Sequence, residues 1–269
     1  MNATPDAARA VGLRSLRYVP SAVGEAGERT LNLYRARGCT SLLEGDAEFA
    51  AQFGRGDYFI LDGQVNVNVE RLDDAARRFA FTDAQFMKID IQGAELEAIR
   101  SAPDLVDHAL LAIRSEVEFA PLYKDQPLFA DLDAELRAKG FTLARFLSQH
   151  KWRRGDRTRG DRVAPGPVPL AEGQLIHGDV LYFRRPETMN AARAEDQDRL
   201  INLALLAFAY GHVDLSAAVL SRGEIATRLR ERVSVNASAL IAELGRAYAA
   251  RRRMALRRQA TTNLRHLVT

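Results

Sequence analysis

The stretch "FMKIDIQGAELEAI" (residues 86–99) joins an apolar, strand-like run to a helical pattern through Gly93. Asp90 and Gln92 follow the apolar run, and Glu95 falls in the first helical turn. In open parallel sheets, ligands bind beyond the carboxyl ends of the strands, where loops and helix amino termini converge. The stretch therefore predicts a ligand site. An equally weighted alternative is that Asp90 and Gln92 only cap a helix beginning near Ala94, with the charge of Glu95 favoured by the helix dipole.

The residues after this stretch alternate between strand-like and helical patterns. Strands are predicted over 86–91 and 109–119, and helices over 94–102 and 128–140, the second ending at Gly140. Such alternation is typical of an α/β domain with a parallel sheet and crossover helices. Two further strands are predicted over 141–149 and 178–185, separated by a polar, arginine-rich loop that is long enough to be functional.

The residues before this stretch predict a smaller set of elements. Residues 4–12 resemble the end of a helix, 13–24 form a strand candidate, and "GERTLNLYRARG" (27–38) alternates like a half-buried antiparallel strand. A hairpin through Glu25–Gly27 would join these two strands. One or two helical turns are predicted at 47–53 and another strand at 65–72, followed by a helix over 73–80 that Asp73 or Asp74 would cap.

The last third of the chain predicts helices alone. Residues 196–223 contain two helical patterns broken at Gly211, with Asp214 available to cap the second, and the remainder is also helical. We therefore expect an α/β domain over 1–186 and an all-helical extension over 187–269.

Composition restricts the class of protein more than its function. The hydrophobic fraction is 47% and the charged fraction 27%, which are values of ordinary soluble proteins. The net charge of +3 does not indicate a nucleic-acid partner, and the single Cys39 cannot form an intramolecular disulfide. With no signal-peptide core and no apolar run long enough to span a bilayer, the sequence predicts a soluble, cytoplasmic protein.

Two acidic residues on a predicted buried strand extend the site. Glu116 and Glu118 are two apart, so a strand points them to the same face. Near Asp90 they would form an acidic rim able to orient a hydroxyl or amine, or to accept its proton. The alternative is pairing with Arg100 or Arg114, or simple exposure at the strand end. The histidines share no metal-ligand spacing, and neither a serine-nucleophile elbow nor a P-loop occurs, so no metal site is predicted.

The central stretch, followed by "SEVEFAPLYKDQPLFADLDAELRAKGFTL" (115–143), resembles the core of FkbM-type methyltransferases. Residues 18–46 resemble the family's upstream part, "VERLDD" (69–74) the approach to the core, and "GDVLYFRR" (178–185) the last strand. The resemblance covers about residues 12–185, and the helical tail resembles extensions of some members. It implies a Rossmann-like class I methyltransferase sheet that uses S-adenosylmethionine.

The resemblance also implies a reaction and roles for the site residues. The reaction is methyl transfer to a hydroxyl, less often an amine, of a small-molecule, sugar or lipid-linked acceptor. Asp90 is the first choice for orienting the acceptor or acting as base, Glu116 or Glu118 the second, and Glu95 the third. Gln92 is expected to contact cofactor or acceptor, and Asp73 either to contact the cofactor or to cap a helix.

One departure from the family pattern bears on activity. Class I methyltransferases hold their cofactor with a glycine-rich loop after the first strand and an acidic residue ending the second, and neither is in this sequence. We therefore expect a sheet incomplete at its amino terminus and a chain that is a fragment of a complete enzyme. The competing hypothesis is an inactive interaction module that binds an acidic partner through "KWRRGDRTRGDR" (151–162) and "RRRMALRR" (251–258). Solvated arginines on loop and helix faces are the simpler explanation of these segments.

Overall fold

A computed structural model describes residues 16–154 and 172–268, with the side chains of the last helix described as far as Leu256. The chain divides into one unit that ends at Tyr182 and a second that begins at Phe183. Each unit is described by itself. The helix predicted over residues 4–12 lies outside the described residues.

A small three-stranded sheet comes first in the chain. It contains β1 (Ala22–Val23), β2 (Gly27–Tyr34) and β3 (Leu61–Glu70) in the order β1-β3-β2. The predicted antiparallel pairing of β2 is confirmed, because Gly27 lies opposite Val69 and the register continues to Tyr34.

The predicted hairpin between β1 and β2 is wrong, because β1 pairs in parallel with the other edge of β3. The backbone N–H of Gly24 donates to the carbonyl of Glu70 at 3.0 Å, and that of Glu25 to Glu97 Oε1 at 2.8 Å. These hydrogen bonds hold the connection against β3 and the helix containing Glu97, so the chain passes from one side of β3 to the other instead of turning back.

The larger sheet carries the predicted α/β pattern. Its strands β4 (Phe86–Ile89), β5 (Ala112–Glu118), β8 (Gln174–Arg184) and β6 (Phe141–Phe146) follow the order β4-β5-β8-β6. The parallel pairing of β4 with β5 is confirmed. A fifth strand, β7 (His150–Trp152), pairs antiparallel with β8, although the sequence predicts only a loop there.

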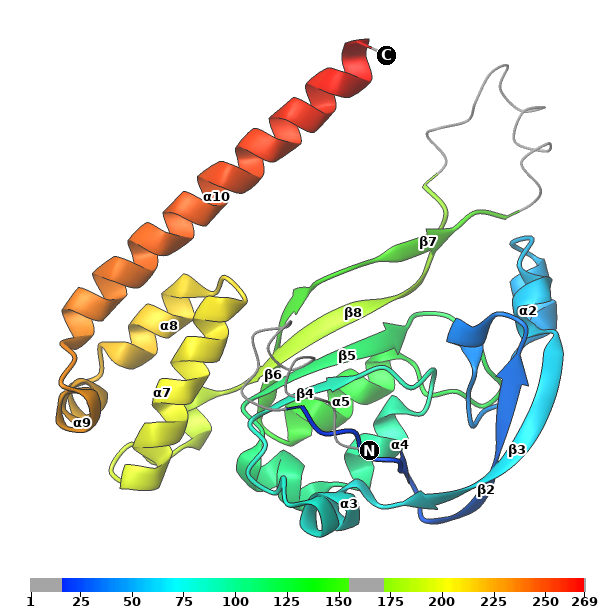
Figure 1. The fold of residues 1–269 in the computed structure, drawn as a ribbon, viewed down its shortest axis with the longest axis horizontal. Helices are drawn as coiled ribbons and strands as arrows, with labels where there is room; N and C mark the ends of the chain where they lie inside the picture. Colours follow the sequence, from blue (N-terminus) through cyan, green and yellow to red (C-terminus); the bar gives the residue numbers. More distant parts are fainter. Residues whose placement is uncertain (1–15, 155–171, 269) are drawn as a thin grey trace. The chain divides into compact units, whose positions relative to one another are not determined.

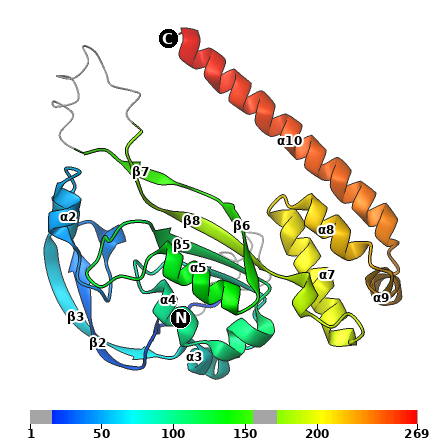
Figure 2. The same ribbon diagram turned by 180° about the vertical axis from the view of Figure 1, so that it is seen from behind.

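Helices of the first unit connect and cover these strands. They are α2 (Ala47–Ala51), α3 (Leu72–Phe79), α4 (Glu95–Arg100) and α5 (Phe129–Ala138), with 3-10 turns η1 (Arg37–Cys39) and η2 (Gly56–Phe59) and a π turn, η3 (Leu105–Ala109). α4 and α5 pack on one face of the larger sheet (Figures 1 and 2).

The two faces of the larger sheet have opposite chemistry. In β5, Ile113 and Val117 point to the core, whereas Arg114 and Glu116 alternate with them and face the other side. The core on the apolar face joins strands, helices and η3, and it includes Ile89, Ile99, Leu105, Ile113, Val117, Leu132, Leu136, Phe141, Val180 and Tyr182. Burial of this face fixes the strand register, and the register in turn positions the polar residues opposite.

A second core packs the small sheet against the segment after β5. Its aromatic rings meet edge to face, with Phe59 between Tyr34 (centroids 5.5 Å apart) and Tyr123 (5.4 Å). Phe53 of the segment after α2 packs edge-on against Trp152 at 5.8 Å. This core fixes Tyr123 and the segment around residues 41–45 next to the turn that follows β4.

The second unit is helical, as predicted. After the 3-10 turn η4 (Pro186–Thr188) come α7 (Ala194–Ala209), α8 (Val213–Leu220), α9 (Gly223–Val233) and α10 (Ala237–Val268). The predicted cap of α8 by Asp214 is wrong: His212 holds the N-cap position, and Asp214 lies in the first turn, where the helix dipole favours its charge. Asp198 of α7 pairs with Arg228 and Arg232 of α9, each at 2.9 Å.

The predicted cap of α3 is also wrong. Arg71 holds the N-cap position, and no side chain caps the helix there. Asp73 is instead 4% exposed, and its carboxylate accepts the backbone N–H groups of Asp104 at 2.7 Å and Leu105 at 3.1 Å. Asp73 lies inside the first turn of α3 and not before it. Its side chain therefore does not cap α3 but holds the start of η3.

Replacing Asp73 by Ala is expected to destabilise the protein by about 2–3 kcal/mol, because two buried N–H groups lose a charged acceptor. Asp74→Ala is the matched control: Asp74 is exposed and pairs with Arg77 on the helix surface, so a change of roughly 0.5 kcal/mol or less is expected. Urea unfolding followed by circular dichroism measures both. Equal effects of the two substitutions would contradict a structural role specific to Asp73.

Candidate functional site

The carboxyl ends of β4 and β5 bring two acidic residues side by side. The register pairs Lys88 with Arg114 and Ile89 with Ser115, so the next position places Asp90 beside Glu116. Gln92 bridges them: its Nε2 donates to Asp90 Oδ1 at 3.0 Å and to Glu116 Oε2 at 2.6 Å. The structure thus brings together three of the residues that the sequence places at the site.

Gln92 is held in a left-handed backbone conformation with φ of +58°, which is rare for a residue other than glycine. Ser41 Oγ donates to its carbonyl at 2.6 Å, and the Tyr123 hydroxyl shares its one hydrogen between the Cys39 carbonyl, at 2.9 Å, and Gln92 Oε1, at 3.2 Å. Backbone strain of this kind concentrates at functional sites, where the surroundings enforce it. The side-chain amide is therefore fixed with its N–H groups directed at the two carboxylates.

The turn after β4 is closed by Glu95. Its Oε1 accepts the backbone N–H of Ile91 at 2.7 Å and its Oε2 that of Gly93 at 2.9 Å. Helix α4 has Ala94 at its N-cap, with no side-chain cap. The reading in which Asp90 and Gln92 cap this helix is wrong, because Ala94 holds the N-cap position and the Gln92 side chain instead bridges Asp90 and Glu116.

Three carboxylates of the site, those of Glu95, Glu118 and Asp90, have shifted pKa values. Burial raises the pKa of Glu95 to about 7, with the charge of Glu116 adding to the effect and the backbone N–H groups opposing it. Burial also raises the pKa of Glu118 well above its ordinary value, and the charges of Glu95 and Glu116 raise it further. For Asp90, burial opposes ionisation, but hydrogen bonds from Lys88, at 2.7 Å, and Gln92 outweigh it and lower its pKa. These contacts therefore favour the ionised form of Asp90, whereas burial favours the neutral form of Glu118.

Glu118 is buried and, like Glu95, is 3% exposed. The side-chain amide of Gln126 faces it and partly offsets the rise in its pKa. Among the described residues, however, Gln126 Nε2 makes no hydrogen bond of standard geometry, while its Oε1 accepts the N–H groups of Leu122 and Tyr123. The alternative pairings of the acidic residues are not formed, since Arg100 pairs with Glu135 and Arg114 with Asp179.

His177 joins the site, although no sequence pattern singles it out. Its Nδ1 lies 3.1 Å from Glu116 Oε1. His150 lies opposite it across the β7–β8 pair, and the two rings stack with centroids 4.5 Å apart and planes 15° apart. Glu116 and His177 are 61 positions apart in the chain, so only the adjacency of β5 and β8 reveals the contact.

Part of the chain matches a known protein family. Residues 14–143 match the model of the methyltransferase FkbM domain. This part of the chain belongs to the FkbM methyltransferase family. No curated protein and no solved structure matches the chain significantly. Among the described residues, no helix is long and apolar enough to cross a membrane.

The FkbM domain does not bring Asp73 to the other site residues. Asp73 contacts the segment after the carboxyl end of α4, whereas Asp90, Gln92 and Glu95 lie at the amino end of that helix. Within the described ranges, no three His, Cys, Asp or Glu side chains converge as the ligands of a metal would.

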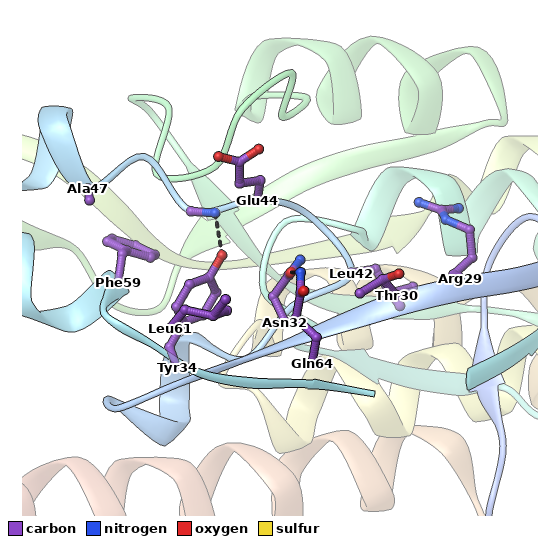
Figure 3. A pocket seen from close by; sticks show the side chains of 11 residues that line it. Arg29, Thr30, Asn32, Tyr34, Leu42, Glu44, Ala47, Phe59, Leu61 and Gln64 are labelled. Atoms are coloured by element: carbon purple, nitrogen blue, oxygen red, sulfur yellow. Dashed lines mark hydrogen bonds between the residues drawn. The ribbon is translucent and has the colours of Figure 1, made fainter. Parts of the chain in front are cut away.

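Two pockets are lined by residues of the FkbM domain. One, of about 10 Å³, lies at the acidic cluster and is lined by Gly93, Glu95, Leu96, Glu116, Val117, Glu118, Pro127, Leu128, Phe129 and Leu132. The other, of about 590 Å³, lies on the β2–β3 sheet and is lined by Arg29, Thr30, Asn32, Tyr34, Leu42, Glu44, Gly45, Ala47, Phe59, Leu61 and Gln64 (Figure 3). Leu42 faces the larger pocket, while Leu43 packs toward Gly93.

The polar groups of the larger pocket are held in fixed positions. Gln64 Nε2 donates to Asn32 Oδ1 at 2.8 Å, and Asn32 Nδ2 donates to the carbonyl of Leu43 at 3.0 Å. The Tyr34 hydroxyl accepts the N–H of Gly45 at 2.6 Å, the contact drawn as a dashed line in Figure 3. A pocket of this size and polarity suits a small polar molecule.

The arginine-rich segments are only partly described. Residues 155–162 lie outside the described ranges. Arg154 donates to Gln52 Oε1 at 2.6 Å and lies over the ring of Phe53, whereas Arg251, Arg252 and Arg253 are exposed on α10. Binding of an acidic partner through these segments stays a prediction.

Replacing Gly93 by Ala is expected to destabilise the protein by about 2–5 kcal/mol, because backbone strain and overpacking add. Gly93 has φ of +99°, and a Cβ would lie 2.9 Å from Gln126 Nε2 and 3.1 Å from both Leu43 and Tyr123. Gly54→Ala is the control, because Gly54 has φ of +67° and open space around its Cβ position, so about 1–2 kcal/mol of backbone strain alone is expected. Denaturant unfolding gives both values, and a Gly93 effect no larger than that of Gly54 would show that close packing at the turn is unimportant.

The raised pKa of Glu95 predicts that stability falls as pH rises from about 4.5 to 7. In this window the native state binds more protons at Glu95 than the unfolded state does, so raising the pH favours unfolding. Glu95→Gln removes the titrating carboxyl group, although the variant also loses an acceptor for one N–H group. The free energy of unfolding of the variant, relative to that of the wild type, should therefore increase as the pH rises. Urea unfolding at several pH values between 4.5 and 8 measures the difference. Parallel pH profiles of the two proteins would contradict the assignment.

Proposed function

We propose that the FkbM domain transfers a methyl group from S-adenosylmethionine to a hydroxyl oxygen, less readily to an amine nitrogen, of a small-molecule, sugar or lipid-linked acceptor. The observation that carries the proposal is the group formed by Asp90, Gln92 and Glu116 at the carboxyl ends of two neighbouring parallel strands. Ligands of open α/β sheets bind at such an edge.

The charge of this group suits the proposed methyl donor. S-adenosylmethionine carries a sulfonium and an ammonium group, and Asp90, which stays ionised, offers a carboxylate to such cations. The adjoining pocket of about 10 Å³ is far below the ~300–1,000 Å³ of enclosed small-molecule sites. Asp90 does not line this pocket, so its carboxylate would meet the charged end of the donor outside it. When bound, the donor supplies a methyl group on a good leaving group.

The side chains of the domain then have separate tasks. Asp90 would accept a hydrogen bond from the acceptor hydroxyl, and Gln92, fixed by Tyr123 and Ser41, would keep Asp90 and Glu116 at a constant separation. Holding reactants in one geometry is the main contribution of a protein when the leaving group is already good. Glu95 would act by holding the turn, since both its oxygens accept backbone N–H groups.

The larger pocket supports an acceptor that bears hydroxyl groups. Its amide side chains, Asn32 and Gln64, are uncharged and pre-oriented, and Arg29 and Glu44, of opposite charge, pair with other residues. Such walls offer hydrogen bonds without a net charge, which matches a neutral sugar or polyol better than a strongly charged molecule. Ser41 lies between this pocket and the acidic group, because its backbone pairs with Asn32 and its hydroxyl contacts Gln92.

Calorimetry with S-adenosylmethionine tests the donor assignment. Binding by the wild type, with about tenfold weaker binding by Asp90→Asn because a charge-assisted contact is lost, would support the assignment and would contradict the expected incompleteness of the cofactor site. Asp62→Asn makes the same chemical change at an exposed residue that pairs with Arg37, so it should leave affinity unchanged. No binding by the folded wild type would overturn the proposal, and salt-sensitive binding of acidic partners in its place would favour an interaction module.

A further inference from the structure

We propose that His177 accepts the proton of the acceptor hydroxyl, and that Glu116 positions its imidazole for this task. The inference rests on the proposed methyl transfer and assigns a residue to its proton-transfer step. Asp90, Glu116 and His177 form a continuous polar row across the neighbouring strands β4, β5 and β8. An acceptor bound over Asp90 would lie beside this row.

The carboxylates of the site are poorly suited to removing a proton. Asp90 is tied to Lys88 and Gln92, and these contacts stabilise its ionised form, so it has a low affinity for a proton. Glu95 has both oxygens occupied by backbone N–H groups. Glu118 is 3% exposed and cannot reach an acceptor bound at the sheet edge. A base near neutral pH must therefore come from another side chain.

The imidazole of His177 has the orientation that a general base needs. Since Glu116 Oε1 is an acceptor 3.1 Å from Nδ1, the neutral ring carries its hydrogen on Nδ1 and keeps the lone pair on Nε2. Among the described residues, none forms a hydrogen bond with Nε2, and the side chain is 24% exposed. A carboxylate that holds one ring nitrogen so that the other can accept a proton is a recurring catalytic arrangement.

The surroundings of His177 hold its ring in place from several elements. His150 of β7 stacks on it, and Trp152 lies edge to face with it, the ring centroids being 6.3 Å apart. Glu116 of β5 lies at Nδ1. On β8 itself the next charged residue on the same face is Asp179, which is neutralised by Arg114 at 3.1 Å. The other oxygen of Glu116 is held by Gln92, so the carboxylate cannot rotate away from the imidazole without losing that bond.

The proton balance of the step follows from this geometry. As the oxygen of the acceptor bonds to the methyl carbon, the bond from that carbon to the donor sulfur breaks and its electron pair stays on sulfur, leaving a neutral thioether. The hydroxyl proton moves to Nε2 of His177. The resulting imidazolium is stabilised by Glu116 and returns its proton to water, so the side chains end the cycle unchanged.

The tautomer of His177 can be tested on the ligand-free full chain. Long-range ¹H–¹⁵N correlation spectra at a pH where imidazoles are neutral should show the hydrogen on Nδ1 of His177, with the signals assigned by their loss in His177→Gln. In Glu116→Ala the hydrogen should move mainly to Nε2, whereas Glu48→Ala, an exposed acid on α2, should change nothing. A wild-type tautomer with the hydrogen on Nε2 would overturn the proposal.

Turnover separates the role of His177 from the proposed function. The assay measures S-adenosylhomocysteine formed with a panel of methyl glycosides and polyols. His177→Gln should lower turnover about 10²–10⁴-fold while the affinity for S-adenosylmethionine stays within about twofold. His108→Gln, at an exposed site, should match the wild type. Normal turnover by folded His177→Gln would overturn only the role of His177, whereas no turnover by the wild type would overturn methyl transfer and this role together.

Discussion

The site depends on one tight turn, in which the carboxylate of Glu95 accepts the N–H groups of Ile91 and Gly93. These bonds force the chain through two residues of positive φ, Gln92 and Gly93, directly after β4. A turn of that shape brings the Gln92 side chain back over the strand end, where it meets Asp90 and Glu116. The same turn starts α4, which covers the apolar face of the sheet. The geometry of the site and the packing of the core therefore both depend on this turn.

The sequence predicts the elements around this turn because their periodicity is local. The apolar run of β4, the helical spacing of α4 and the alternation in β5 each occupy fewer than a dozen residues, and burial of one sheet face enforces them. Strand partners are a different matter. β1 and β2 follow each other with a short connection, yet both pair with β3, because hydrogen bonds from Gly24 and Glu25 direct the chain across β3. β7 was missed because its three residues begin a long polar segment and become a strand only by pairing with β8.

Some site residues can be predicted from local sequence patterns, whereas others are identified only from the arrangement of the strands. Asp90, Gln92 and Glu116 are found from the sequence because they sit at the ends of adjacent predicted strands, and the β4–β5 register brings them together. The sequence predicts Asp73 as a site residue from its place in a motif, but its carboxylate accepts the N–H groups at the start of η3. His177 gave no local signal. His177 and Asp179 are two positions apart, which places both on one face of a strand. Only the strand order shows that this face brings His177 to Glu116.

A cluster of four carboxylates would repel itself if all were ionised, and the domain avoids this by giving each a different environment. Asp90 lies at the exposed edge beside Lys88 and stays charged, whereas Glu118 lies under the sheet edge and favours its neutral form. Glu95, between them, has a pKa of about 7. When the environments of acidic groups in one site separate their pKa values, charge stabilisation and proton transfer can be divided among different residues. At the edge of the sheet, Asp90 contacts Lys88 and Glu116 contacts His177, so these two carboxylates serve different partners while Gln92 joins them.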